Sequence, residues 1–139
     1  MKKGIIFLVL TVLLMGLVLS GCSSGTNLPK DVSSGEVIGF LRLDMTEQEK
    51  YSSHATYTHQ FLKNAREHGI QGYPVSVLLS ANRILLFAGF KTTDRGWMYV
   101  LPVIDQEVKL AKGKSYRELN GSSPFGPEED IIVDIMIFQ

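Results

Sequence analysis

The sequence predicts an α+β fold, mainly an antiparallel β-sandwich of six or seven strands with one helix, at about 46–68, packed on it. One early stretch has the periodicity of an amphipathic helix, whereas the later apolar runs are short and separated by turn residues. The single cysteine among 139 residues allows neither an internal disulfide nor a thiolate metal cluster. A chain of this length, 45% hydrophobic, is therefore expected to form one domain around an apolar core.

Residues 1–21 are predicted to be a signal peptide. Lys2 and Lys3 precede an uncharged apolar run at 4–19, in the order of a secretory signal. The run is shorter than the roughly 20 residues that a membrane-spanning helix needs. It ends in four residues that resemble the lipobox of bacterial lipoproteins: Leu19, Ser20, Gly21 and Cys22.

The lipobox resemblance implies cleavage between Gly21 and Cys22 and acyl chains such as palmitate on Cys22. The protein would then be attached to the membrane of the cell envelope through these chains. With Ser23 rather than Asp after the cysteine, the resemblance also implies the outer membrane, facing the periplasm, in a cell with two membranes. The alternative is a free or buried Cys22 beside an uncleaved N-terminal anchor.

Residues 22–35 are predicted to be a lipidated flexible tether, and residues 36–139 a single globular sandwich domain. The tether is rich in Ser and Gly without a hydrophobic period, and such a segment reaches about 20 Å. The whole chain has 14 basic and 14 acidic residues, which argues against nucleic-acid binding. Removal of Lys2 and Lys3 leaves 12 basic against 14 acidic residues, so the acyl chains would have to provide the membrane attachment.

The predicted helix begins with a capping box and ends before a glycine. Thr46 is followed three residues later by Glu49, the spacing at which the two side chains satisfy backbone donors at a helix start. Gly69 follows the run and suits a helix end. A largely apolar stripe, with Phe61 beside it, recurs at steps of three and four residues: Tyr51, Ala55, Thr58, Leu62 and Ala65. This stripe predicts the face of the helix that packs on the sheet.

The strands are predicted from β-branched and aromatic runs bounded by turn residues. They are 36–43 before the helix, a hairpin of 75–79 and 84–90 joined at 81–83, then 97–104, 107–110, 115–119 and 131–138. The last run is apolar except for Asp134, so it is predicted to be a central strand buried on both faces. Asp134 is expected at an edge, a bulge or a partner-bonded position.

Three segments resemble the transthyretin-like and carboxypeptidase-regulatory-like sandwich domains: 72–79, 91–100 and 113–116. Those domains share a strand, a hairpin, a Thr-Asp-x-x-Gly turn, an aromatic strand and a late Gly-x-x-Tyr. In the turn, Asp94 is expected to accept from backbone donors two residues on and Gly96 to take a positive φ. The resemblance implies a fold and no catalytic residue.

The residues that could carry chemistry do not form a recognised pattern. His54 and His59 are five apart, whereas ligands on one helix face are three or four apart, so no metal or other cofactor is predicted. The run at 21–25 fits the Gly-x-Ser-x-Gly pattern but lies at the predicted cleavage site, not at an elbow between a strand and a helix, and no catalytic residue is predicted. The acidic run at 128–130 is interpreted as a solvated loop that precedes an aggregation-prone strand.

The sequence therefore predicts a non-enzymatic cell-envelope lipoprotein whose membrane-tethered domain binds a protein partner or acts as an assembly or accessory factor. The aromatic residues Tyr57, Trp97 and Tyr99 are the candidate partner surface, and core packing is the alternative for them. The other hypotheses are a small-ligand-binding lipoprotein module with a cavity under the helix, an accessory lipoprotein of a secretion or conjugation apparatus, and a lipid-anchored hydrolase. The oligomeric state stays open.

Overall fold

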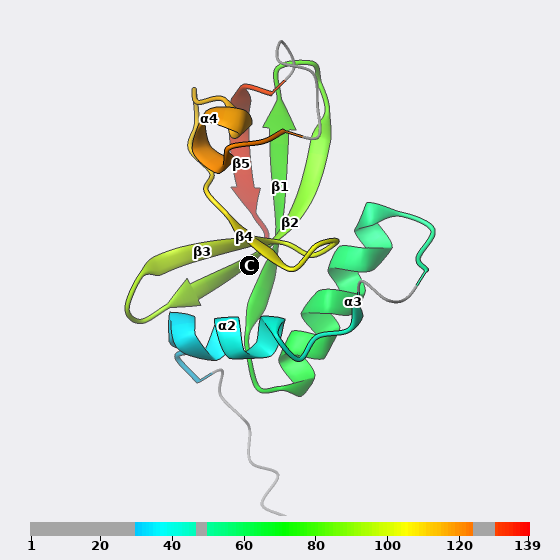
Figure 1. The fold of residues 1–139 in the computed structure, drawn as a ribbon, viewed down its shortest axis with the longest axis vertical. Coiled ribbons are helices and arrows are strands. Elements are labelled where there is room, and N and C mark those ends of the chain that lie inside the picture. Colours follow the sequence, from blue (N-terminus) through cyan, green and yellow to red (C-terminus); the bar gives the residue numbers. More distant parts are fainter. Residues whose placement is uncertain (1–29, 47–49, 124–129) are drawn as a thin grey trace, which may run out of the picture.

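The computed structural model describes residues 30–46, 50–123 and 130–139. They form a mostly β, α+β fold around one five-stranded antiparallel sheet, with the strand order β4-β3-β2-β1-β5 (Figure 1). The strands are β1 Gly72–Leu79, β2 Ile84–Thr92, β3 Gly96–Leu101, β4 Gln106–Val108 and β5 Ile132–Ile137. The helices are α2 Ser34–Leu41, α3 His54–Glu67 and α4 Tyr116–Asn120. All five strands lie in this one sheet, so the described residues do not form the second sheet of a sandwich.

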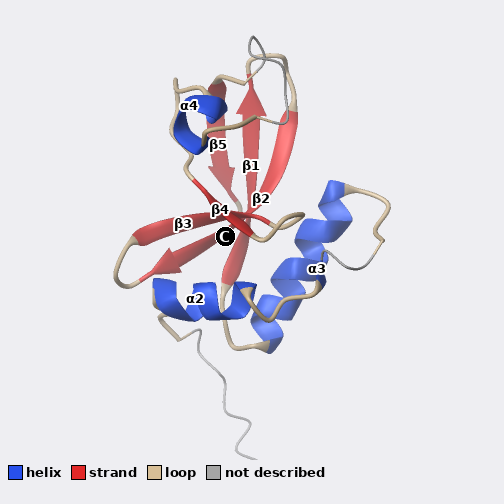
Figure 2. Cartoon of the chain, viewed as in Figure 1, coloured by secondary structure: helices blue, strands red, loops and turns tan. Residues whose placement is uncertain are grey.

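The helices cover opposite faces of the sheet at opposite ends (Figure 2). On one face, α2 and α3 pack on the part of the sheet that contains Ala88, Phe90, Met98 and Val100. On the other face, α4 packs through Tyr116 on a second cluster, whose buried strand residues are Val75, Val77, Leu79, Phe87, Val108 and Ile132. Alternate residues of a strand point to opposite faces, so β1 and β2 contribute to both clusters.

The predicted helix is confirmed but starts later than its proposed capping box. α3 begins at His54, and its N-cap is Ser53, whose side chain accepts from the backbone N–H of Thr56 at 3.3 Å. Thr46 is instead buried before the helix, where its hydroxyl donates to Asp44 at 2.9 Å; Glu49 lies outside the described residues. Phe61, which was expected beside the apolar stripe, is fully buried and belongs to the face of α3 that packs on the sheet.

The prediction of a first strand at 36–43 is wrong, because this segment lies mostly in helix α2. Ser33 forms a capping box with Glu36, since the Ser33 N–H donates to the Glu36 carboxylate at 2.8 Å and the Glu36 N–H to the Ser33 hydroxyl at 3.3 Å. Val37 and Phe40 are three residues apart and face the core. The local cap and this helical spacing outweigh the strand preference of the segment.

The ordered fold begins before Glu36, the first residue of the predicted domain. Val32 is buried and forms a parallel bridge with Thr92 of β2. The last residues assigned to the flexible tether therefore belong to the folded domain.

The predicted hairpin is confirmed as β1 and β2. The strand predicted at 97–104 is confirmed as β3 only up to Leu101, because 102–105 form a turn. Asn82, in the hairpin turn, has φ 56°, and Gly96, the first residue of β3 after the turn from β2, has φ 72°, as expected for these turns. The segment 115–119, predicted as a strand, forms helix α4, because Ser115 caps its start by accepting from the Glu118 N–H.

The last strand was predicted to be central, and this prediction is wrong: β5 lies at the edge of the sheet beside β1. Ile132 is buried, and Ile135 and Ile137 pack on the cluster beneath α4, whereas Val133, Met136 and Phe138 are exposed. Asp134 lies beside the register shift at Leu78/Leu79 and forms an ion pair with Lys112. The prediction of an edge, bulge or partner-bonded position for Asp134 is confirmed.

Candidate functional site

The face of the sheet that carries α2 and α3 is left uncovered near the β1–β2 turn. Ser76 pairs with both Leu86 of β2 and Met136 of β5, and paired residues share a face of the sheet. We call this surface the open sheet face; its apolar residues are Pro74, Leu78, Ile84, Leu86, Met136 and Phe138. Ile84 is 62% exposed, Met136 41% and Phe138 54%. These residues come from three neighbouring strands, so they form one surface rather than isolated exposed side chains.

A groove of about 490 Å³ separates α3 from this face. Its floor consists of the side chains or backbone of Leu62, Gly72, Pro74 and Leu86. Gly72 is required in the floor, because a Cβ at this position would lie 2.6 Å from both Leu62 and Phe90. The rim is formed by one stripe of α3 that carries cationic or titratable side chains: His59, Lys63 and Arg66.

A second hollow, a cleft of about 420 Å³, lies beside β2. Strand β3 pairs only with residues 88–92 of β2, so the first half of β2 is free of β3 and lines the cleft. Apolar side chains dominate the lining: Leu85, Phe87, Leu101, Ile104 and Val108. His54, Gln106 and Tyr116 add polar groups, and burial raises the pKa of the Tyr116 phenol, which stays a neutral hydrogen-bonding group at neutral pH.

The structure brings together two of the three predicted partner-surface aromatics. Trp97 and Tyr99 of β3 have parallel rings with centroids 6.3 Å apart, and Tyr73 of β1 meets Trp97 edge-on at 5.7 Å. Tyr57 is on α3, where it contacts Tyr51 at 4.8 Å. Tyr73 was missed by the sequence argument, although its register with Gly89 places it beside the Trp97 ring.

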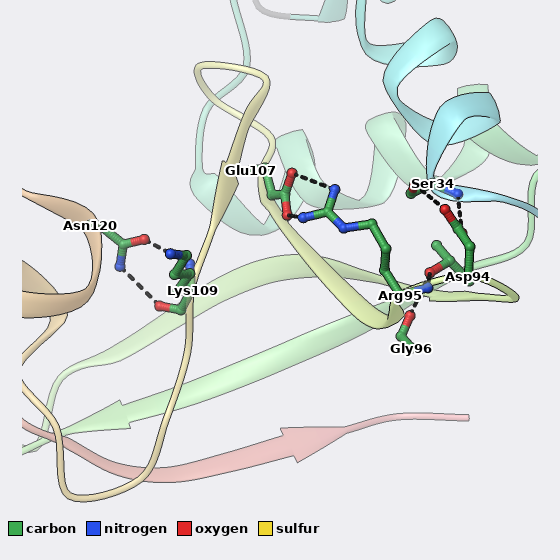
Figure 3. A network of polar contacts seen from close by, with 8 residues as sticks. Ser34, Asp94, Arg95, Gly96, Glu107, Lys109 and Asn120 are labelled. Carbon is green, nitrogen blue, oxygen red and sulfur yellow. Dashed lines mark hydrogen bonds and ion pairs between the residues drawn. The ribbon is translucent and has the colours of Figure 1, made fainter.

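Polar contacts tie the loops around the sheet to one another (Figure 3). The backbone N–H and the hydroxyl of Ser34 donate to the Asp94 carboxylate at 2.7 and 2.5 Å. Arg95 forms a two-pronged contact with Glu107, the shorter prong at 2.7 Å. Asp94 therefore anchors the start of α2 to the β2–β3 turn, a role that the turn motif alone did not predict.

Replacing Asp94 by asparagine is expected to lower stability at neutral pH and to have little effect in acid. The hydrogen bonds from Ser34 hold the pKa of the Asp94 carboxyl below its usual 3.8. A depressed pKa contributes stability that is present above the unfolded-state pKa and is lost as the pH falls through the folded-state pKa. The stability difference between the two proteins, measured by urea unfolding, should therefore begin to narrow below about pH 4 and should close as the pH falls through the folded-state pKa.

The matched control for this measurement is Asp31→Asn, which removes the same charge from an exposed carboxylate near α2. Asp31 makes no side-chain hydrogen bond within the described part of the chain. A stability difference for Asp94→Asn that stays constant from pH 7 to pH 2 would contradict an ionised cap.

The described residues contain no group of three or more His, Cys, Asp or Glu side chains that could hold a metal ion. His54 lines the cleft beside β2 and His59 lines the groove beside α3, so the two histidines lie in different hollows. His68 packs against Phe40, with ring centroids 5.4 Å apart. None of the helices in the described ranges is long and apolar enough to cross a membrane.

Asp130, interpreted as part of a solvated loop, is instead buried. Its carboxylate accepts from the Ser115 hydroxyl at 2.9 Å and from the Arg117 backbone N–H at 3.1 Å. It therefore fixes the start of α4. Residues 128 and 129 and the predicted signal and lipidation positions Gly21, Cys22 and Ser23 lie outside the described residues.

Searches of the chain against protein-family models, curated proteins and solved structures found no match.

Proposed function

We propose that this protein is a non-enzymatic cell-envelope lipoprotein, anchored through acyl chains on Cys22, whose domain binds a protein partner through the open sheet face. The observation that carries the partner-binding role is the cluster of exposed apolar side chains on β1, β2 and β5. Ile84, Met136 and Phe138 lie on one face and are each at least 41% exposed. Contiguous apolar surface of this kind typically marks an interaction site.

The arrangement of the core also favours a partner over a buried ligand. The space between α3 and the sheet is filled by Phe61, Leu62 and Ala65, which are all buried. The groove beside α3 is open to solvent rather than enclosed. A partner that covers the open sheet face would bury its apolar residues at a density typical of interface cores.

Site-specific photo-crosslinking in membranes of the producing cell tests this function. A photoreactive phenylalanine at Ile84 or Met136 is expected to give one discrete adduct, which Phe138→Asp should abolish. The same probe at Leu43, which is 68% exposed but outside the open sheet face, is the matched control. A probe at Trp97 tests the aromatic surface in the same experiment. Equal adducts from Leu43 and Met136, or none from Ile84 and Met136, would contradict the proposed docking surface.

Cys22→Ala is expected to leave a full-length precursor without acyl chains, because the lipobox cysteine is the residue that would be acylated. Labelled palmitate should be incorporated by the parent chain and not by the variant. Ser23→Ala, next to the cysteine, is the control and should be labelled normally. Normal labelling of Cys22→Ala would overturn the lipoprotein assignment while leaving the docking surface to the crosslinking experiment.

The alternative function is binding of a small apolar ligand, and the β2 cleft is the observation that favours it. Its volume of about 420 Å³ lies within the range of ligand pockets, and Tyr116 and Gln106 could orient a polar end. Native mass spectrometry of the purified protein would reveal such a ligand as an added mass. The mass should be lost in Leu101→Trp, which fills the cleft.

A further inference from the structure

We propose that the partner docks as an amphipathic helix, which lies beside α3 on the open sheet face and directs a flank of acidic side chains at His59, Lys63 and Arg66. This inference rests on the proposed function and specifies the chemistry of the partner.

The sheet face on which α3 packs has space for a second helix beside α3. α3 packs over β1 and β2 through Phe61, Leu62 and Ala65, and its 14 residues span about 21 Å. The remaining width of this face, over β1 and β5, carries Leu78, Met136 and Phe138 with no helix above them among the described elements. A second helix packs about 8–10 Å from its neighbour, so a partner helix beside α3 would rest on these three side chains.

Basic side chains of α3 line the groove that would separate α3 from the partner helix. His59, Lys63 and Arg66 are spaced four and three residues apart and form one stripe on α3. The Lys63 side chain is 3.9 Å from the Glu67 carboxylate, both exposed, whereas the Arg66 side chain makes no hydrogen bond or ion pair with the described part of the chain. No acidic side chain lines the groove within the described ranges. A partner with carboxylates along the facing flank would supply the missing counter-charges, while its apolar face would cover the floor.

A protein helix fits this site better than an anionic membrane surface. The cations line a groove whose floor contains Gly72 and Pro74, and a flat bilayer surface would not fill such a hollow. Residues 22–139 also carry two more acidic than basic side chains, which opposes adsorption to anionic lipids.

The test uses the full acylated chain in nanodiscs of zwitterionic lipid and two synthetic 18-residue helices with the same leucine face. One helix carries glutamates along one flank and the other carries lysines, and binding is measured by fluorescence anisotropy. The glutamate helix should bind, and added salt should weaken its binding. The double reversal Lys63→Glu/Arg66→Glu should lower the affinity for the glutamate helix about tenfold. Each exposed ion pair raises the affinity by up to a few-fold, and charge reversal adds repulsion. The matched control, Lys91→Glu/Lys114→Glu, reverses two exposed cations outside the groove and should change it little.

The outcomes separate this inference from the proposed function. If both helices bind equally and Met136→Asp abolishes both, the apolar docking surface stands and the acidic-flank chemistry is overturned. If neither helix binds while the photoreactive probe at Met136 still crosslinks to a partner in membranes, the partner is not a helix of this kind and the inference is overturned. Recruitment of the nanodiscs to phosphatidylglycerol vesicles that is lost on the Lys63/Arg66 reversal, without helix binding, would overturn it in favour of the membrane. Circular dichroism of each variant verifies that it is folded.

Discussion

Replacing Phe61 by alanine is expected to lower the free energy of unfolding by about 3–5 kcal/mol, the usual cost of removing a fully buried phenylalanine. Phe61 is fully buried on the sheet-facing side of α3. Its ring contacts Phe40 of α2 and Phe90 of β2, at centroid distances of 5.2 and 6.1 Å. It is therefore the side chain through which two helices and the sheet share one core. Alanine favours helix formation, so the loss would come from packing and not from helix propensity.

Urea unfolding followed by circular dichroism measures this effect, and Tyr57→Ala is the control on the same helix. Tyr57 is only partly buried and lies outside the cluster that contains Phe61, so its replacement should cost about 1 kcal/mol or less. Equal losses for the two variants would show that α3 is not held on the sheet by the Phe40–Phe61–Phe90 cluster.

Most of the central sheet could be predicted from the sequence because its signals are local. The β1–β2 hairpin and the turn at Gly96 follow from short apolar runs bounded by turn residues. The existence of α3 follows from its helical period. The start of α3 was misplaced because both Thr46 and Ser53 have side chains suited to an N-cap, and tertiary contacts select between them: Asn64 of α3 donates to the Thr46 hydroxyl at 2.9 Å and holds that residue outside the helix.

The errors concern segments whose structure depends on distant partners. The run at 36–43 contains valine, isoleucine and phenylalanine, and its helical form is fixed by Ser33 and by contact with α3 and Asp94. The position of β5 at the sheet edge depends on strand pairing, which periodicity does not encode. An apolar run exposed on one face at an edge reads in sequence like a strand buried on both faces.

The candidate site was only partly predicted, because it too depends on contacts between segments that are distant in the sequence. Trp97 and Tyr99 were identified by their residue type, and alternate residues of one strand share a face. The open sheet face combines Ile84, Leu86 and Met136 through the pairing of β1 with both β2 and β5. A single sequence does not reveal that pairing, although the apolar residues that it brings together, Pro74 excepted, lie in segments that the sequence predicts as strands.

Deleting residues 131–139 is expected to abolish cooperative folding, even though β5 lies at the edge of the sheet. Ile132, Ile135 and Ile137 all face the cluster beneath α4. Full burial of such a side chain contributes about 1.5–3 kcal/mol; Ile132 is fully buried, and Ile135 and Ile137 are partly buried. Folded domains of this size hold only about 5–15 kcal/mol in total. β5 also anchors the loop between β4 and α4, because Gly113 donates to the Ile132 carbonyl at 2.8 Å and Ile132 donates to the Lys114 carbonyl at 2.9 Å.

The truncated chain should therefore show no cooperative thermal transition by circular dichroism, whereas a chain that lacks only Gln139 should melt like the parent. The exposed β5 residues provide a second control, since Met136→Ser removes apolar surface that contacts solvent and should retain the transition. If the chain ending at Asp130 melted near the parent temperature, the cluster beneath α4 would not depend on β5. The open sheet face would then not require Met136 and Phe138, because the sheet would be stable with β1 as its edge. Loss of the transition in the truncated chain alone would show that β5 stabilises the domain through its inward face, which leaves its outward residues Met136 and Phe138 available for a partner.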